Sequence, residues 1–370
     1  MALIYIIIFI ILISSTYLGM HYYVYTRIVS GLLLSAPVTN YLRFFFLIAA
    51  LSFVLSEFLS RHVISSWIKP FAHFGTLWLG VISISISVFL IADILRVFFN
   101  SQQFRYYSTI YSISAITLLT IFSIYNVSRG IRIKEIKLKT EKLPKNLSKF
   151  SIVQLSDLHL DFLKNRKWFN DVVEKTNALN PDIIVITGDL IDTNLCNIDD
   201  HCELLTKLKS KYGVYAITGN HEYYTGLETF LDICKNSNIN VLRNEKVTIA
   251  NCIELAGVND EEGKRFSGGG PDLNLALKNC DFKKPVILLA HRPTMFKDAV
   301  KSGVDLQLSG HTHAGQIPPV DLLVTLIYKY SYGFHKKNSS YIYTTFGTGT
   351  WGPPMRLFSR SEIVKIIIEK

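Results

Sequence analysis

Four long apolar stretches fill the first third of the chain and leave the backbone there few options. They cover residues 2–25, 44–59, 70–92 and 106–128. A helix needs about 20 mainly apolar residues to cross a hydrocarbon core of about 30 Å, and each stretch approaches or exceeds that length. Because no water is available inside a bilayer, backbone polar groups must be bonded within the segment. The sequence therefore predicts a transmembrane region of about four helices over residues 1–128.

Charged residues set the second stretch apart from the others. Arg43, Glu57 and Arg61 lie in it or beside it, so their side chains must extend toward the headgroups. The first stretch occupies the place of a secretory signal. It lacks a basic start, however, it is too long for the apolar part of such a signal, and more apolar stretches follow it. We expect it to remain in the protein as a helix.

Basic residues concentrate in the segment 129–149, directly after the fourth stretch. Lys and Arg beside a span favour the cytoplasmic side, so we expect the remainder of the chain, and with an even span count the N-terminus, to be cytoplasmic. Much of the formal net charge of +10 lies in and just after the apolar third. A membrane surface is therefore the expected partner, and nucleic acid is not. The basic residues are Arg129, Arg132, Lys134, Lys137, Lys139, Lys142, Lys145 and Lys149.

The chain after the apolar third has the mixed composition of a globular protein. Residues 131–138 alternate between apolar and charged side chains, as in an edge strand, so we assign 129–149 to a basic juxtamembrane segment and edge strand. Residues 150–370 are numerous enough to bury a core of their own. All five cysteines lie in this part without CxxC spacing. They favour free thiols in a reducing compartment over a disulfide framework.

Apolar runs and helical patterns alternate at the start of this domain. Strands are expected at 150–155, 183–186 and 214–217, with helices at 168–179 and 202–209 between them. The later part is richer in strand patterns. These cover residues 241–249, 252–256, 286–290, 306–308, 341–345 and 363–368. The order predicts an α/β fold with two packed sheets covered by helices.

Short motifs rich in carboxylate, amide and imidazole groups follow the expected strands in one order. They read Asp157-Leu158-His159, Gly188-Asp189, Gly219-Asn220-His221-Glu222, His291 and Gly310-His311-Thr312-His313. Each motif alone is weak, because Asp157, for example, taken by itself is better explained as a strand-end turn residue that caps the next helix. Together they bring oxygen and nitrogen ligands to the carboxyl ends of strands, where open α/β sheets bind ligands. Such a set suits two adjacent divalent cations.

In these motifs the sequence resembles the calcineurin-like metallophosphoesterases, and among them the bacterial membrane-associated branch. The resemblance covers about residue 150 to the C-terminus and includes the segment Gly352-Pro353-Pro354-Met355-Arg356, but it leaves out the four apolar stretches. It implies a four-layer α-β-β-α sandwich. It also implies a metal-dependent hydrolase of phosphoric esters or pyrophosphates.

The resemblance assigns a role to each motif residue. The implied ligands are Asp157, His159 and His313 for one metal ion, Asn220, His291 and His311 for the other, and Asp189 as the bridge. Mixed nitrogen and oxygen ligands fit Mn²⁺, Fe or Zn²⁺, and two such ions activate water for attack on phosphorus. His221 stays outside the metal set as a catalytic acid for the leaving oxygen. Glu222 or another carboxylate is expected to orient it.

Two arginines are candidates for substrate binding. Arg292 and Arg356 carry the planar group that binds phosphate oxygens in pairs, and structural ion pairing is an equally open alternative for both. Three aromatic residues, Tyr223, Phe346 and Trp351, either line the pocket or pack beneath it.

The leading hypothesis is a membrane-anchored dinuclear-metal phosphohydrolase that cleaves a phosphodiester or pyrophosphate in a lipid or lipid-linked substrate. UDP-2,3-diacylglucosamine, a lipid A precursor, is a candidate implied by the resembling branch. One alternative is an envelope-facing phosphodiesterase of generic specificity. Another is a membrane transporter or sensor whose metal-binding domain serves as a ligand module.

Overall fold

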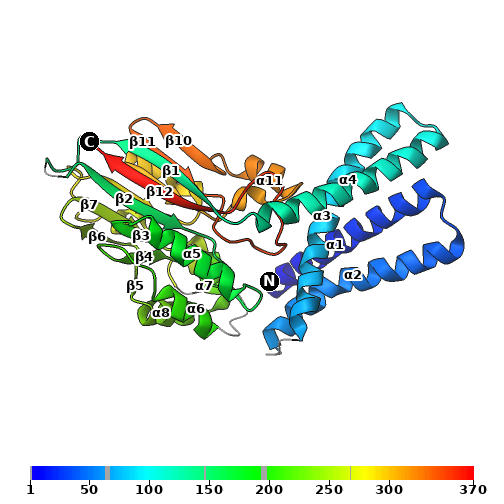
Figure 1. Ribbon diagram of the computed structural model, residues 1–370, viewed down its shortest axis with the longest axis horizontal. Coiled ribbons are helices and arrows are strands. Elements are labelled where there is room, and N and C mark those ends of the chain that lie inside the picture. The colour runs from blue at the N-terminus through cyan, green and yellow to red at the C-terminus, as the bar shows by residue number, and fades with distance from the viewer. Residues whose placement is uncertain (1, 63–66, 146, 193–197, 267) are drawn as a thin grey trace. The chain divides into compact units, whose positions relative to one another are not determined.

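The computed structural model describes residues 2–62, 67–145, 147–192, 198–266 and 268–370 (Figure 1). The chain divides into two compact units, each described here by itself. The helical unit comprises Met1–Ser128 together with Gln316–Leu322 and Gly352–Phe358. The α/β unit comprises Arg129–Gly315, Leu323–Trp351 and Ser359–Lys370.

Four long helices form the body of the helical unit. They are α1 (Ala2–Leu32), α2 (Ala36–His62), α3 (Ile68–Phe98) and α4 (Gln102–Ser128). Within the described part of the chain, three segments are long and apolar enough to cross a membrane: Ala36–Leu59, Ile68–Phe98 and Gln102–Ser128. About four membrane-crossing helices were expected, and three of the four long helices meet this requirement in their described residues. Membrane crossing by α1 stays a prediction.

Two short segments from the later chain are built into the helical unit. The hydroxyl of Ser83 in α3 donates to the carbonyl of Pro318 at 2.7 Å, and the Asn126 side chain in α4 donates to the carbonyl of Arg356 at 3.0 Å. Three apolar side chains of these segments complete the unit's core together with residues of α1 to α4. They are Ile317, Met355 and Leu357. A division of the chain at residue 128 alone does not anticipate this grouping.

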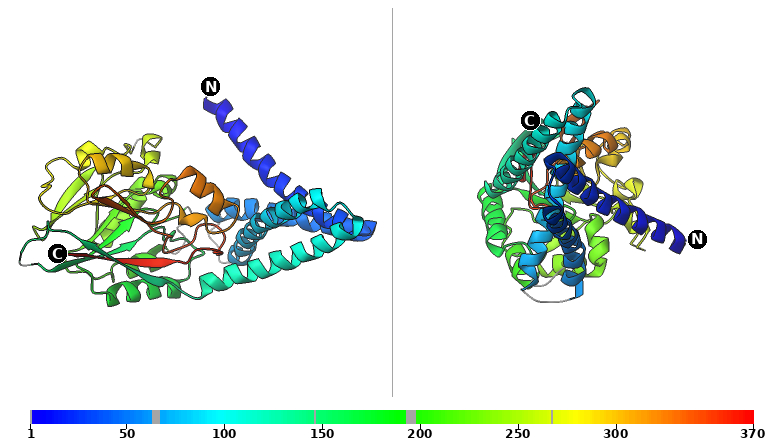
Figure 2. Two further views of the ribbon diagram at one scale, coloured as in Figure 1. Left: turned by 90° about the horizontal axis from the view of Figure 1, so that it is seen from above. Right: turned by 90° about the vertical axis from the view of Figure 1, so that its right-hand side faces the viewer.

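Two six-stranded sheets form the centre of the α/β unit (Figure 1). The first has the order β1-β12-β2-β3-β4-β5. Its strands are β1 (Arg132–Lys139), β2 (Lys149–Leu155), β3 (Ile183–Thr187), β4 (Val214–Ile217), β5 (Ile239–Val241) and β12 (Glu362–Glu369). The C-terminal strand β12, red in Figure 2, pairs parallel to β1 and antiparallel to β2. β1 is the edge strand that its alternating pattern predicts.

The second sheet has the order β10-β11-β9-β8-β7-β6. Its strands are β6 (Glu245–Ile249), β7 (Ile253–Gly257), β8 (Val286–Leu289), β9 (Leu306–Ser309), β10 (Gly333–Lys337) and β11 (Ser340–Thr344). The helices of the unit are α5 (Arg166–Ala178), α6 (Ile198–Leu205), α7 (Asn220–Thr225), α8 (Leu227–Asn236), α9 (Leu273–Ala276) and α10 (Phe296–Lys301), and α11 (Val320–Ile327) begins in the segment that joins the helical unit.

Alternate residues of each central strand face two different cores. In β3, Ile184 and Ile186 pack with α5 and α8, whereas Ile183 and Val185 face the second sheet. Successive side chains of a strand point to opposite faces, so a strand buried on both sides needs an uninterrupted apolar run. The strands of the second sheet repeat this arrangement toward α9 and α10. The predicted four-layer sandwich is confirmed.

One expected strand is wrong in its extent. The apolar pattern at 241–249 suggests a single strand, but the structure has β5 in the first sheet and β6 in the second. The break falls at Asn244, whose φ of 56° is a turn conformation that a strand cannot contain. Asparagine tolerates this conformation better than most residues, so the chain turns here from one sheet to the other.

Candidate metal centre

The first two motifs continue the pairing of β2 and β3 beyond the strands. The backbone N–H of Asp157 donates to the carbonyl of Gly188 at 3.1 Å, and that of His159 donates to Asp189 at 3.0 Å. Neighbouring parallel strands end at one edge of a sheet, so these loops emerge together. Asp157 and Asp189, which are about thirty residues apart in the chain, are therefore held in fixed register.

Most of the ligand residues have an unusual backbone conformation. Asp157, His159, Asp189, His311 and His313 all have positive φ, between 47° and 71°. Residues with side chains rarely adopt this region, and strain of this kind concentrates at functional sites. The conformation turns each side chain away from the strand direction and into one cluster.

Glycines in the motifs allow the loops to approach one another. A Cβ atom at Gly188 would lie 2.5 Å from Nδ1 of His291, and one at Gly219 would collide with the Asp189 carboxylate. A Cβ at Gly310 would meet Ser156 and Asp157. The absence of side chains at these positions is therefore required for the ligands to converge.

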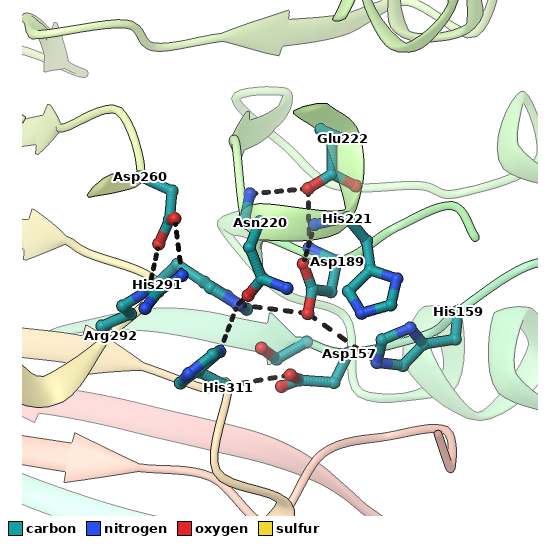
Figure 3. A network of polar contacts seen from close by, with 12 residues as sticks. Asp157, His159, Asp189, Asn220, His221, Glu222, Asp260, His291, Arg292 and His311 are labelled. Carbon is teal, nitrogen blue, oxygen red and sulfur yellow. Dashed lines mark hydrogen bonds and ion pairs between the residues drawn. The ribbon is translucent and has the colours of Figure 1, made fainter. Parts of the chain in front are cut away.

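Asp189 lies at the centre of the cluster, with imidazoles around it (Figure 3). Its Oδ1 accepts the backbone N–H of His221 at 3.0 Å. Its Oδ2 lies 3.2 Å from Nε2 of His291 and 3.8 Å from Nε2 of His159. One carboxylate oxygen is thus shared between histidines of the two expected metal groups, which is the position of a bridging ligand.

The residues expected to bind the first metal ion face one another. Nε2 of His159 lies 3.1 Å from Nε2 of His313, and that nitrogen lies 3.5 Å from Oδ1 of Asp157. Oδ1 of Asp157 also accepts the backbone N–H of His311 at 2.8 Å. Oδ2 of Asp157 is buried and makes no hydrogen bond within the described residues. Burial raises the pKa of this carboxyl group.

The second expected group has the same character. Nε2 of His291 lies 3.3 Å from Oδ1 of Asn220 and 3.2 Å from Nδ1 of His311. Burial, together with the neighbouring charge of His291, holds the pKa of His311 well below its usual range. A neutral imidazole keeps the lone pair that a metal ligand needs.

Three of these histidines have a polar neighbour at the other ring nitrogen. Nδ1 of His291 donates to the carbonyl of Thr187 at 2.8 Å, and Nε2 of His311 is bonded to the Tyr328 hydroxyl at 3.0 Å. Nδ1 of His159 lies 3.3 Å from Asp192. Such partners set the tautomer and ring orientation of metal-binding histidines.

The cluster fits two divalent cations by its donor set and its charge. Burial would lower the pKa of His291, but the negative charge of Asp189 outweighs it and raises the pKa to about 10. An environment that holds a proton so firmly on a buried imidazole is strongly negative, and a cation is stabilised by the same field. The facing nitrogen pairs and the buried Asp157 oxygen supply lone pairs that point inward.

His221 is held by a carboxylate that the sequence did not single out. Its Nδ1 donates to Oδ1 of Asp192 at 3.0 Å, which leaves Nε2 for a transferable proton. Burial would lower the pKa of His221, but the charge of Asp189 and the hydrogen bond with Asp192 raise it to about 9. His221 also has a ring nitrogen within 4.8 Å of ligand atoms of His159 and Asp189. It therefore borders the metal cluster directly.

Glu222 supports the loop of Asp189 and makes no hydrogen bond to His221 among the contacts described. Its two oxygens accept the backbone N–H groups of Asp189 at 2.9 Å, Leu190 at 2.8 Å, Ile191 at 3.3 Å and Gly219 at 2.6 Å. Burial, then the charge of Asp189, raises the pKa of Glu222 to about 7. Of the two options left open by the sequence, the structure favours another carboxylate as the residue that orients His221.

The two candidate arginines have different surroundings. Nε and Nη2 of Arg292 donate to Asp260 at 2.9 and 3.1 Å, and Glu262 lies 3.4 Å away. Arg356 is completely buried in the helical unit, where its backbone N–H donates to Ser123 at 3.1 Å. Arg292 thus forms structural ion pairs, and the backbone of Arg356 is bonded within the helical unit. Substrate contact by either stays a prediction.

Aromatic side chains surround His221. The ring centroid of Trp351 lies 5.9 Å from that of His221, and Tyr224 lies 5.4 Å from it. Phe266 packs edge-on against Tyr224. Trp351, Tyr224 and Phe266 are exposed, whereas Tyr223 is buried below them. Of these rings the sequence singled out Trp351 and Tyr223. It gave no signal for Tyr224 and Phe266.

Comparison with known proteins agrees with this site. Residues 150–315 match the sequence profile of the calcineurin-like phosphoesterase family. A metallophosphoesterase of Aquifex aeolicus, described as uncharacterized, is 39% identical over 242 residues, which cover 65% of this chain and 92% of that protein. The chain belongs to the calcineurin-like metallophosphoesterases, a family of metal-dependent phosphoesterases, as its motifs predict.

A relative named as a transmembrane protein is similar over a longer region. A "transmembrane protein with metallophosphoesterase domain" from Danio rerio is 34% identical over 282 residues, which cover 73% of this chain and 64% of that protein. The chain therefore spans slightly less than two thirds of that relative. Among solved structures, a dimetal phosphatase from Danio rerio has a TM-score of 0.35 and 15% identity, covering 54% of this chain and 87% of that one.

Asp192 and Tyr328 are the supporting residues that sequence reasoning missed. Asp192 follows Asp189 by three positions, so its proximity to the motif was a usable signal. Tyr328 lies seventeen positions after its partner His311 and directly after α11. No local pattern in the sequence indicates that contact.

Proposed function

We propose that this protein is a membrane-anchored phosphohydrolase that uses two divalent cations to cleave a phosphodiester or pyrophosphate bond in a lipid or lipid-linked substrate. The observation that carries the proposal is the central position of Asp189, with one oxygen shared between His159 and His291. The membrane-length helices in the same chain support a substrate that resides in a bilayer.

Two groups of residues have separate roles, one in binding the cations and one in proton transfer. Bound divalent cations supply Lewis-acid polarisation of the phosphate and a lowered pKa for the attacking water. The buried side chains of Asp157 and Asp189, together with the surrounding imidazoles, would bind these cations. His221, with its pKa raised to about 9, carries a proton at neutral pH and donates it from Nε2 to the leaving oxygen.

The exposed aromatic residues indicate which kind of leaving group the site favours. Trp351 and Tyr224 flank His221, so a group leaving past this histidine moves along aromatic faces. Such faces favour apolar or planar groups over small hydrated ones. A lipid-linked nucleotide or an aryl ester fits this environment, and UDP-2,3-diacylglucosamine is one candidate of that kind.

Hydrolysis of a chromogenic aryl phosphodiester by the detergent-solubilised chain, with Mn²⁺, Fe²⁺ and Zn²⁺ supplied in turn, tests the proposal. Metal-dependent release of the aryl group is expected. Asp189→Asn and His221→Ala should each reduce the rate at least about 100-fold, in line with losses of general-acid and metal catalysis. Full activity in both variants, or tight binding of the ester without turnover, would reject the hydrolase and favour a ligand-binding module.

The sidedness of the catalytic domain is a separate part of the proposal. The basic segment 129–149 supports a cytoplasmic location. Reporter fusions at the C-terminus measure this, using one reporter active only in the cytoplasm and one active only outside it. Activity of the external reporter alone would replace the cytoplasmic assignment with an envelope-facing phosphodiesterase.

A further inference from the structure

Six of the eight residues of helix α11 are apolar, and none of the eight, all of which the structure describes, is buried. Leu326 and Ile327 are 73% and 71% exposed, and Leu323 is half exposed. Asp321 is the one charged residue in the helix. A contiguous exposed apolar surface of this kind marks contact with a partner or a membrane.

The chain around α11 indicates which of these covers it. Residues Gln316–Leu322, which include the first turn of α11, belong to the unit built from the membrane-length helices. Pro318 accepts a hydrogen bond from Ser83 of α3, and Ile317 packs in the core of that unit. The helix therefore starts from a segment that is anchored among the membrane helices.

The residues that follow α11 have the composition of a membrane interface. Lys329 comes directly after Tyr328, Tyr332 is exposed just before β10, and Phe334 is exposed within β10, which ends with Lys336 and Lys337. Aromatic rings and Lys side chains are enriched at the headgroup level, next to apolar segments that enter the acyl region. This order, apolar then aromatic and basic, matches a helix that lies in the membrane surface.

The helix is also connected to the metal centre. It follows the ligand motif 310–313 by only a few residues, and the hydroxyl of Tyr328, the residue after its last turn, is bonded to Nε2 of His311 at 3.0 Å. A short covalent path and a hydrogen bond thus join the exposed apolar surface to a residue expected to bind metal.

We propose that α11 is inserted in the acyl-chain region of the bilayer that the helical unit spans, and that it brings the phosphate of a membrane lipid to the metal centre. Insertion is independent of catalysis. Delivery of the lipid rests on the proposed function and names its substrate class as a phosphoester lipid taken directly from the membrane surface.

Photolabelling of the full chain tests insertion without any substitution. The protein is reconstituted in phosphatidylcholine vesicles that contain a phosphatidylcholine with a diazirine in its acyl chain, and labelled residues are located by peptide sequencing in a mass spectrometer. Label is expected on residues 323–327 of α11. The peptide 266–278 serves as the control, because its Leu275 is 51% exposed on α9. Label on α2 to α4 but none on 323–327 would overturn the proposal.

Two substrates that share the same p-nitrophenyl phosphodiester group, one soluble and one lipid-bound, test the delivery of lipid to the metal centre. Bis(p-nitrophenyl) phosphate is the soluble probe, and a diacylglycerol p-nitrophenyl phosphodiester in phosphatidylcholine vesicles is the lipid probe. Leu326→Glu is expected to lower hydrolysis of the lipid probe about tenfold or more, because a charge in the acyl region is strongly disfavoured, and to leave hydrolysis of the soluble probe unchanged. Leu275→Glu is the matched control and should affect neither.

The outcomes separate this proposal from the proposed function. Equal hydrolysis of the lipid probe by Leu326→Glu and the unchanged chain would overturn delivery. If Leu326→Glu hydrolysed neither probe while Leu275→Glu hydrolysed both, delivery would also be contradicted, because α11 would then act through the fold of the metal site. Absence of turnover in the unchanged chain would reject the hydrolase, while the photolabelling would still decide insertion.

Discussion

Oδ1 of Asp192 accepts a hydrogen bond from Nδ1 of His221 at 3.0 Å. The other oxygen of the same carboxylate lies 3.3 Å from Nδ1 of His159. One side chain thus holds both the expected proton donor and an expected metal ligand in place. Burial disfavours the charge on Asp192, but the two histidines keep its pKa well below the usual range.

Asp192→Asn is expected to shift the alkaline limb of the pH–rate profile to lower pH by about one unit or more. An acid must be protonated to act, so activity falls as the pH rises through the pKa of His221. In the unchanged protein that pKa is raised to about 9, partly by Asp192, and the amide removes this contribution. The measurement is kcat against pH with the aryl phosphodiester.

Asp171→Asn, a substitution of a half-exposed helix residue that removes the ion pair with Lys175, is the control and should leave the profile unchanged. An alkaline limb in Asp192→Asn that coincides with that of the unchanged protein would contradict the assignment of His221 as the acid.

Glu222→Gln should weaken metal binding while the fold persists. In the unchanged protein Glu222 accepts hydrogen bonds from backbone N–H groups. The glutamine places an NH₂ group against these donors, so the loop of Asp189 loses part of its support. Loss of such an outer partner typically costs 10–100-fold in metal affinity, and we expect about that range here. Competition with a metal-binding dye measures the affinity. Unchanged affinity would mean that the loop is positioned by other contacts.

Trp351→Ala should raise KM for the aryl diester up to about tenfold with a smaller effect on kcat, because an aromatic contact contributes about 1 kcal/mol. The ring is exposed beside His221 and so is available to a bound leaving group. Phe282→Ala, also an exposed ring but on a loop before β8, is the matched control. A lower kcat at constant KM would assign Trp351 to the support of His221 and not to substrate binding.

Arg132→Met should lower the apparent melting temperature by about 5 °C, which corresponds to about 2 kcal/mol. Nη2 of Arg132 lies 2.8 Å from Glu362, a fully buried carboxylate that also accepts from the hydroxyl of Tyr343 at 2.7 Å. The substitution leaves that charge without its cation. Lys134→Met, on an exposed position of the same strand, should shift the melting temperature by less than about 1 °C.

Local patterns in the sequence were sufficient to predict most of the strands and helices and the ligand residues. Buried strands such as β3 and β4 appear as short apolar runs, and the motifs follow them directly. Contacts between distant segments could not be predicted in the same way. The hydrogen bond of Tyr328 to His311 and the placement of Met355 among the long apolar helices depend on tertiary packing, which leaves no periodic signal in one sequence.

The positive φ angles of the ligands had no signal either, because Asp157 and His159 are ordinary residue types for a loop. What favours the conformation is the arrangement around it, including neighbouring glycines and the backbone bonds to the loop of Asp189. The sequence identified which residues converge, whereas the backbone geometry explains how they do so.

The metal content of the purified chain, determined by elemental analysis against protein concentration, decides whether these residues form a dinuclear centre. About two divalent ions per chain are expected, and Asp189→Asn should lose at least one of them because its oxygen is shared between the two groups. A chain that binds no divalent ion, or an Asp189→Asn variant with the full content, would contradict the dinuclear centre.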